Sequence, residues 1–431
     1  MLTRLDLRGY EGDLSVVLPR PSGADPAVTA AVREIIDAVR ERGDIALREL
    51  TKRFDGCVIV DELRVPERDL AAALEGLDPD LRAALEFAAD QIISYHESQR
   101  EADTKHERQG VQVREMVVPV DRAGLYVPGG GAPLASTVLM TAIPARIAGV
   151  PEIVLCTPPE AATGRPPATT LAAAALTGVD EVYCVGGAQA IAAMAYGTES
   201  IFPVDVVVGP GNRYVAAAKR EVQGVVGIES LAAESELAVI ADDSANPDWV
   251  AADLLAQAEH GPGGLAIVIT WSEAFADAVD TSLRALLERT TRRAEAEATL
   301  SSGGRLVLVD NAAEAIAVAN VIAPEHLQIM NDDPDMLVAE VRNAGAVFCG
   351  PYAPAVIGDY VAGVNHVLPT GGTARFASAL RVSNFQKRIH VVNLDRAALD
   401  RVGPYASVLA ESEGLDAHAR SIRIREPGSA Q

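Results

Sequence analysis

A chain of 431 residues with 49% apolar side chains is long enough for two large α/β domains with hydrophobic cores, and general disorder is excluded. The net charge of −23 argues against a nucleic-acid partner, because phosphate backbones are bound by clustered lysine and arginine. Charged residues such as Arg4, Asp6 and Arg8 leave no apolar core for a secretory signal in the first twenty residues, so we expect a cytoplasmic protein.

The N-terminal part of the chain has a helical pattern. Apolar residues recur at helical spacing over 26–110, most clearly in 28–50 and 81–96. We therefore expect a helical region over 1–120, packed on the second of two α/β domains.

Residues 123–145 carry no charge and are long enough to cross a bilayer. Three prolines and four glycines within this stretch would break a helix in lipid. The pattern instead predicts a glycine-rich loop leading into a buried helix, with no membrane partner.

From about residue 113, short apolar runs rich in β-branched residues alternate with alanine-rich helical stretches. The runs are 154–156, 182–185, 204–209, 237–242, 265–270, 306–310 and 346–350. This alternation is typical of parallel βαβ units and predicts two α/β domains, 121–235 and 236–380. The remaining tail, 381–431, has one strand-like piece followed by short helices. It is too small for its own core and should pack on its own body or on a partner subunit.

Three glycine-rich loops, 125–131, 185–190 and 207–212, each follow an apolar strand and precede a helix. Ligands bind at the carboxyl ends of parallel strands, and helix N-termini favour phosphate groups. Ordinary tight turns are the alternative for each loop, and none has the GxGxxG pattern. The loops therefore suggest a nucleotide site without identifying the nucleotide.

The four cysteines form no CxxC pair, so a thiolate metal site and a disulfide framework are not indicated, and we expect buried thiols in a reducing compartment. Nitrogen and oxygen donors are better candidates. Gln257 and His260 are spaced i, i+3 at the end of a predicted helix. The alternative for His260 is a favourable contact with the negative end of the helix dipole.

Further polar groups follow along the chain. Glu325 and His326 are adjacent and could transfer two protons, although a surface turn is the alternative. The glycine-rich loop 358–372 contains one acid, Asp359, and one imidazole, His366, and is otherwise uncharged. In the tail, His418 stands five residues after Glu413. Gln257, His260, Asp359 and His418 would make a zinc-type set of donors, but spacing alone does not select them.

Taken together, these segments resemble the histidinol dehydrogenase family from about residue 26 to 425. The resemblance is carried by LYVPGG, STVLMTAIPA, VGGAQAIAAMAYGT, VVGPGNRYVAAAKR, LLAQAEHGP, APEHLQI, RNAGAVF, GDYVAGVNHVLPT and Glu413 with His418. It implies two incomplete Rossmann-like parallel-sheet domains and a homodimer in which each tail, 381–431, completes the other chain's site. The implied reaction is the two-step oxidation of L-histidinol to L-histidine through L-histidinaldehyde, with two NAD and one zinc ion per subunit that orients the substrate.

The resemblance also implies roles for individual residues. The zinc ligands would be Gln257, His260, Asp359 and His418, which also contact substrate. The catalytic pair would be Glu325 and His326, with His326 also contacting substrate. Further substrate contacts would be Ser235, His366 and Glu413, and NAD contacts would be Tyr126, Gln189 and Asn212.

This chain departs from the family pattern near one substrate position. Ala233 and Glu234 stand where the family usually has Gly-Pro, Ala355 stands where Glu is frequent, and Val364 replaces a common hydroxyl residue. Two alternatives follow: a related zinc- and NAD-dependent dehydrogenase of another small polar alcohol, or a non-catalytic zinc- or nucleotide-binding protein. The second would require a lost catalytic residue, and both Glu325 and His326 are present.

Overall fold

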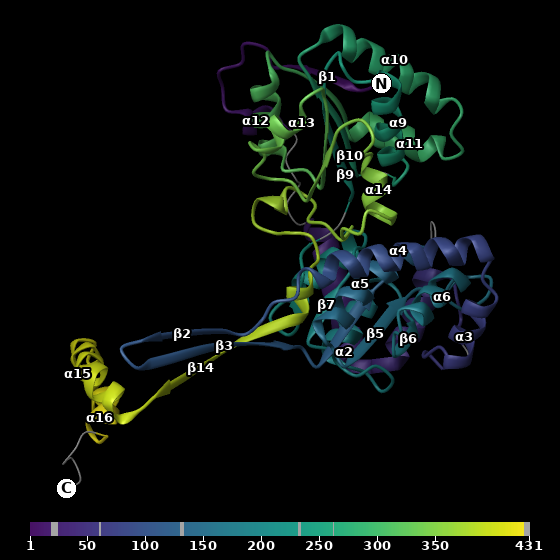
Figure 1. The fold of residues 1–431 in the computed structure, drawn as a ribbon. Helices are drawn as coiled ribbons and strands as arrows, with labels where there is room; N and C mark the ends of the chain where they lie inside the picture. The colour runs from purple at the N-terminus through teal and green to yellow at the C-terminus, as the bar shows by residue number, and fades with distance from the viewer. Residues whose placement is uncertain (19–24, 60–61, 130–132, 232–233, 262, 426–431) are drawn as a thin grey trace. The chain divides into compact units, whose positions relative to one another are not determined.

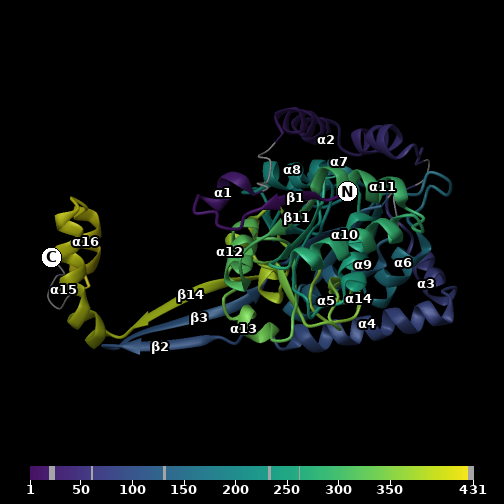
Figure 2. The same cartoon turned by 90° about the horizontal axis from the view of Figure 1, so that it is seen from above.

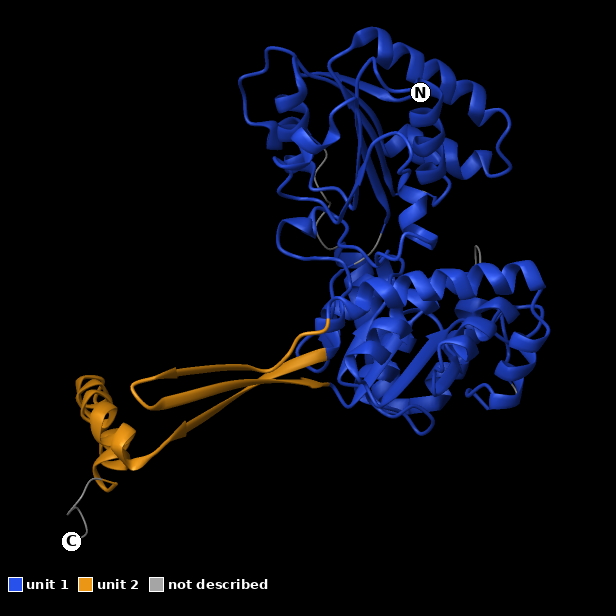
Figure 3. Cartoon of the chain, in the orientation of Figure 1, with its two compact units in different colours: residues 1–99, 120–385 blue, residues 100–119, 386–431 orange. Residues whose placement is uncertain are grey.

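The computed structural model describes residues 1–18, 25–59, 62–129, 133–231, 234–261 and 263–425. They form two compact units, coloured separately in Figure 3. The first unit comprises residues 1–99 and 120–385, and the second comprises residues 100–119 and 386–431. The first unit contains two parallel sheets, which we call the N-terminal and C-terminal sheets.

The N-terminal sheet has the strand order β6-β5-β4-β7-β8. The chain adds β5 and β6 on one side of β4, and then returns to add β7 and β8 on the other side. Its strands are β4 (Arg122–Tyr126), β5 (Glu152–Thr157), β6 (Glu181–Cys184), β7 (Val206–Val208) and β8 (Gly227–Ile228). One core joins the sheet to α5 (Ala135–Ala148) and α6 (Ala168–Leu176). The opposite core joins it to α7 (Gly187–Tyr196) and α8 (Arg213–Val222).

The C-terminal sheet repeats this order as β11-β10-β9-β12-β13, with β1 added beside β11. Its strands are β9 (Glu236–Ala241), β10 (Leu265–Thr270), β11 (Gly304–Leu308), β12 (His326–Met330), β13 (Ala346–Cys349) and β1 (Thr3–Asp6). Leu237 and Val239 face a core shared with α9 (Pro247–Ala258), α10 (Glu273–Leu287) and α11 (Arg293–Gly303). Ala238 and Ile240 face the opposite core with α12 (Ala312–Ile322). Figure 1 shows α12 on one side of this sheet and α9 and α11 on the other. The predicted pair of incomplete Rossmann-like domains is confirmed.

The N-terminal helices do not pack where the sequence analysis placed them. Helix α2 (Pro26–Asp55) packs on α7 and α8, α3 (Glu67–Glu75) on α6, and α4 (Pro79–Glu97) on α5. Figure 2 shows α2 beside α7 and α8. The expectation that 1–120 packs on the second α/β domain is therefore wrong for the main packing of these helices. The reason is that α7 is apolar nearly all round and needs a second covering layer. Within the described part of 1–120, β1 pairs with β11 and α1 (Leu14–Val17) packs on α12 of that domain.

The second unit is built on an antiparallel sheet of order β14-β3-β2. Its elements are β2 (Thr104–Arg108), β3 (Val111–Pro119), β14 (Gln386–Leu394), α15 (Arg396–Ser412) and α16 (Asp416–Arg423). The expected strand and short helices of the tail are present. The expected helical character of 1–120 is wrong for 104–119, because these residues pair as a hairpin and then with β14, far away in the sequence.

The uncharged stretch 123–145 passes through β4 and into the buried helix α5. Gly130 and Gly131 of its loop lie outside the described residues. Among the described residues, no helix is both long and apolar enough to cross a membrane. A loop feeding a buried helix, as predicted, is what the described part of this stretch forms.

Candidate active site

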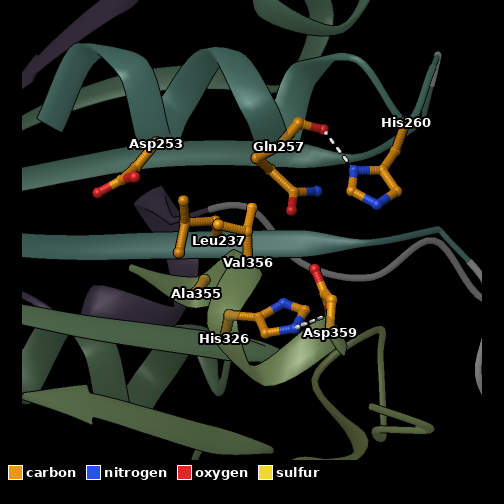
Figure 4. A pocket seen from close by; sticks show the side chains of 8 residues that line it. All are labelled: Leu237, Asp253, Gln257, His260, His326, Ala355, Val356 and Asp359. Carbon is orange, nitrogen blue, oxygen red and sulfur yellow. Dashed lines mark hydrogen bonds and ion pairs between the residues drawn. The ribbon is translucent and has the colours of Figure 1, made fainter. Parts of the chain in front are cut away.

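A small polar pocket lies at the amino ends of the central strands of the C-terminal sheet (Figure 4). Its lining residues are Leu237, Asp253, Gln257, His260, His326, Ala355, Val356 and Asp359. Figure 4 shows Gln257 and His260 on one side, with His326 and Asp359 opposite them. Three of the four predicted zinc ligands and one member of the predicted catalytic pair therefore meet in one place.

Helix α9 supplies one side of the pocket. It starts at the N-cap Asn246 and ends at Ala258, so Gln257 lies in its last turn as predicted. His260 lies two residues beyond the helix rather than in its final turn, because the chain leaves the helix before Gly261. The Nδ1 atom of His260 is 3.1 Å from the carbonyl oxygen of Gln257. A proton on Nδ1 would satisfy this carbonyl and leave the lone pair of Nε2 available to a ligand.

Helix α14 (Ala355–Tyr360) supplies Asp359 on the opposite side. Burial raises the pKa of this carboxyl, but the neighbouring His326 outweighs burial and the net pKa is lowered. His366 holds the backbone at this point: its Nδ1 lies 3.0 Å from the Asp359 carbonyl oxygen and its Nε2 lies 3.2 Å from Thr137 Oγ1. Both ring nitrogens of His366 thus face protein atoms, and its predicted role as a substrate contact stays a prediction.

Glu325 and His326 are buried at the start of β12, with 6% and 5% of their surfaces exposed. The surface-turn alternative is therefore wrong. Oε2 of Glu325 accepts hydrogen bonds from Ser235 Oγ at 2.6 Å and from the Glu236 N–H at 2.9 Å. Nδ1 of His326 lies 3.1 Å from the Glu236 carbonyl oxygen, and its Nε2 lies 3.7 Å from Asp359.

The charges around His326 favour its protonated form. Burial lowers the pKa of the imidazole, but Glu325 and Asp359 outweigh burial and raise it to about 10. A cation bound by Asp359 would cancel the field of one of these carboxylates and bring the pKa back toward neutrality. The protonation state of His326 is therefore coupled to what Asp359 binds.

Sequence reasoning missed two acidic residues of this site, Asp253 and Glu236. Asp253 lies one helical turn before Gln257 on the same face of α9, and it accepts a hydrogen bond from Gln328 Nε2 at 2.7 Å. The i, i+4 spacing of 253 and 257 was the available signal.

Glu236 is 7% exposed, and its two carboxylate oxygens accept the N–H groups of Glu325 at 3.3 Å and Gly371 at 3.1 Å. Burial and the nearby Glu325 raise the pKa of Glu236 to about 7. An acid placed directly before the apolar run 237–242 was the sequence signal for this residue.

The pocket suits a metal ion that prefers nitrogen and oxygen donors. Gln257 is nearly buried, and its Nε2 has no hydrogen-bond partner within the described residues, although its Oε1 lies 3.3 Å from Ser235 Oγ. Amide orientation is interchangeable, so the unpaired atom can equally be the oxygen that a metal would bind. Gln257, His260 and Asp359 supply three donors, one short of a tetrahedral zinc site. One of these donors is an amide, and the described chain contains no group of three His, Cys, Asp or Glu side chains placed to hold a metal.

The tail residues belong to the second unit. Glu413 caps α15 and His418 lies in α16. Neither is among the lining residues of the pocket in the first unit.

The predicted NAD contacts lie at the carboxyl ends of the strands of the N-terminal sheet. Tyr126 ends β4, and its hydroxyl oxygen accepts the Gly187 N–H at 3.0 Å. Gln189 lies in the first turn of α7, is 1% exposed, and has no hydrogen-bond partner for either amide atom among the described residues. Asn212 is the N-cap of α8 and accepts the Tyr214 N–H at 3.0 Å. These residues share an edge with two helix N-termini, which favour phosphate groups.

The departure at Glu234 is accommodated by a glycine. A Cβ atom on Gly263 would lie 2.7 Å from Glu234 Cγ, so Glu234 packs on the backbone there. Ala233 lies outside the described residues.

Comparisons with known proteins agree on one family. The family profile described as histidinol dehydrogenase matches residues 18–426. Similar relatives include the histidinol dehydrogenase of Rhizobium meliloti (strain 1021), which is 48% identical over 96% of each chain. That of Thermobifida fusca (strain YX) is 47% identical over 100% of this chain and 99% of its own. The crystal structure of histidinol dehydrogenase from Elizabethkingia anophelis superimposes with a TM-score of 0.92, at 35% identity and 98% coverage of both chains.

The raised pKa of Glu236 predicts that the free energy of unfolding depends on pH. The folded protein holds this proton more tightly than the unfolded chain between pH 4.5 and about 7. The stability of the wild type should therefore fall as the pH rises through this window, by about 3 kcal/mol from this residue. Glu236→Gln has no proton to lose there and should lack this part of the decline.

The measurement is the midpoint of urea unfolding between pH 4.5 and 7.5 for both proteins. Glu75→Gln, an exposed position on α3, is the control and should follow the wild type. Parallel curves for the wild type and Glu236→Gln would contradict the assignment.

Proposed function

This chain belongs to the histidinol dehydrogenase family, and from that premise we propose that it oxidises L-histidinol to L-histidine through L-histidinaldehyde with two NAD, as the last step of histidine biosynthesis in the cytoplasm. The observation that supports this most is the meeting of Gln257, His260, Asp359 and His326 in one pocket, beside Glu325. The test is the yield of NADH, which should be two per histidinol. No turnover of histidinol, with turnover of another small polar alcohol, would favour a related dehydrogenase instead.

Gln257, His260 and Asp359, with His418 as the fourth donor, would hold a zinc ion. The donor set is of the nitrogen and oxygen type that zinc accepts, and the C-terminal end of α9 adds partial negative charge near a cation. When bound, zinc would take nitrogen atoms of the substrate as ligands and so orient it, rather than generate hydroxide.

In the first oxidation, His326 is the base. A cation on Asp359 would bring the pKa of His326 back toward neutrality. The bond of Nδ1–H to the Glu236 carbonyl then fixes the neutral tautomer, so Nε2 would carry the lone pair that accepts the alcohol proton. NAD, when bound, would accept the hydride that leaves the carbon bearing this hydroxyl. Ser235, His366 and Glu413 are the proposed further contacts with the substrate.

In the second oxidation, Glu325 is the base that activates water for addition to the aldehyde. Its Oε2 is held by Ser235 and by the Glu236 N–H. Its Oε1 accepts no hydrogen bond from the described residues and is available to a water molecule. After releasing the first proton to solvent, His326 again takes the hydroxyl proton, and a second NAD, when bound, would accept the hydride that the hydrated aldehyde loses.

NAD binding is assigned to the carboxyl edge of the N-terminal sheet, through Tyr126, Gln189 and Asn212. Gln189 supports this assignment because a buried amide without partners is costly unless a ligand satisfies it. The N-termini of α7 and α8 would favour the pyrophosphate.

A homodimer with shared sites is the proposed assembly. Helices α15 and α16 bury few residues, and they leave Tyr405, Val408, Leu409 and Ile424 exposed. Exposed apolar side chains gathered on a small unit are typical of a protein interface. In such a dimer, the partner subunit's tail would bring its copies of Glu413 and His418 to this chain's pocket.

Removal of one metal donor should remove the metal. We expect His260→Ala to lose bound zinc and to turn over histidinol about 100-fold more slowly or worse, since one of few donors is lost. Zinc content by mass spectrometry and steady-state turnover are the measurements. His106→Ala, on exposed β2, is the matched control. Full zinc content with normal kinetics in His260→Ala would rule out the assignment.

The two oxidations should respond differently to loss of the Glu325 carboxylate, because only the second consumes water. In Glu325→Gln we expect oxidation of supplied histidinaldehyde to slow by roughly 100-fold or more, with a smaller effect on the first hydride transfer. Single-turnover kinetics with each substrate separates the steps. Equal losses at both steps would refute this division of roles.

Shared sites predict complementation between two inactive variants. A heterodimer of His260→Ala and His418→Ala subunits should contain one site with both lesions and one intact site. Co-refolding should restore activity toward half of the wild-type value per heterodimer, measured after the heterodimer is isolated with two affinity tags. If each tail instead serves its own chain, both sites keep one lesion, and the isolated heterodimer stays inactive.

A further inference from the structure

A fully buried ion pair lies beneath the loop that joins β7 to α8. Lys219 on α8 and Glu229 after β8 have no exposed side-chain surface, and Lys219 Nζ lies 2.7 Å from Glu229 Oε1. Neither residue belongs to the catalytic pair, the metal donors or the predicted NAD contacts.

The pair holds both backbone polar groups of Gly209. The Gly209 N–H donates to Glu229 Oε1 at 2.7 Å, and Lys219 Nζ donates to the Gly209 carbonyl at 3.0 Å. Gly209 has φ +125°, and a Cβ there would come within 2.1 Å of the Tyr126 carbonyl oxygen. The ion pair therefore fixes the point at which this loop crosses the end of β4.

Stability alone does not account for such a pair. Removing two charges from water costs more than their attraction commonly returns, and well-packed apolar residues are often as good or better. Glu229 Oε2 adds to this cost, because it is buried without a hydrogen-bond partner in the described part of the chain. What the pair provides, and apolar residues would not, is a fixed direction for the Gly209 peptide groups.

That direction matters because the loop leads to Asn212. Asn212 accepts the N–H groups of Tyr214 and Val215 and so sets the N-terminus of α8, three residues after Gly209. We propose that Lys219 and Glu229 are positioning residues for NAD, which hold the Gly209–Asn212 loop against Tyr126 in the geometry that the dinucleotide requires. This inference rests on the proposed function for the identity of the ligand.

The test replaces the pair with apolar residues of similar length, Lys219→Met with Glu229→Met. We expect a folded protein whose Kd for NAD, measured by titration calorimetry without substrate, is weakened about tenfold or more. The KM for NAD should rise in parallel, while the KM for histidinol should stay within about twofold of the wild type, because the substrate pocket lies on the other sheet. Arg33→Gln with Glu221→Gln removes an ion pair from the same helix and should leave NAD binding unchanged.

Two results would overturn the proposal: a folded double variant that binds NAD as the wild type does, or equal increases in both KM values, which would indicate general loss of structure. If the double variant fails to fold, Glu229→Gln, which keeps an acceptor for the Gly209 N–H, replaces it under the same criteria. Direct titration of NAD separates this inference from the proposed function. Wild-type protein that binds NAD but does not oxidise histidinol would refute only the assigned substrate.

Discussion

Glu236 and Glu325 bury two carboxyl groups side by side where β9 and β12 begin, and each accepts the backbone N–H of the other residue. Burial raises the pKa of Glu236, and repulsion from the neighbouring Glu325 raises it further. The pair persists because neighbouring donors satisfy it: Ser235 on Glu325, and Gly371 on Glu236. The strand pairing that creates this contact also turns His326 toward Asp359. The geometry of the pocket therefore depends on the register of β9 against β12.

The two α/β domains share one strand order, but the proposed NAD and metal sites lie at opposite edges of their sheets. At the carboxyl edge of the N-terminal sheet, helix N-termini carry partial positive charge and suit an anionic dinucleotide. At the amino edge of the C-terminal sheet, the end of α9 carries partial negative charge and suits a cation. A duplicated architecture thus offers two electrostatic environments, and the proposed reaction needs both.

The second unit is held together mainly by backbone pairing rather than by a large core. Its long antiparallel strands satisfy their backbone hydrogen bonds by pairing, but its helices bury few side chains. A unit with so small a core would gain stability if another chain covered its apolar surface, as in the proposed homodimer. This is the physical reason why the proposed fourth metal donor can lie on a segment without a substantial core of its own.

The apolar runs in the sequence predicted seven strands of the two parallel sheets, and the motifs predicted the family, but β12 and the β2–β3 hairpin were not predicted. The run 265–270 is β10 to the residue, and the motifs around Gln257, Glu325 and Asp359 identify the histidinol dehydrogenase family. Local periodicity indicates whether a segment is a helix or a strand and which of its faces is apolar. Both follow from the spacing of residues within the segment itself.

Tertiary structure decided what each buried face contacts. It placed α2, α3 and α4 on the N-terminal domain, paired β3 with β14, and showed Glu325 to be buried rather than in a surface turn. It also revealed Glu236 and the Lys219–Glu229 pair, whose partners lie on other elements or act through backbone atoms. Such contacts join residues distant in the chain, and no local pattern of side chains encodes which distant backbone group a buried charge will meet.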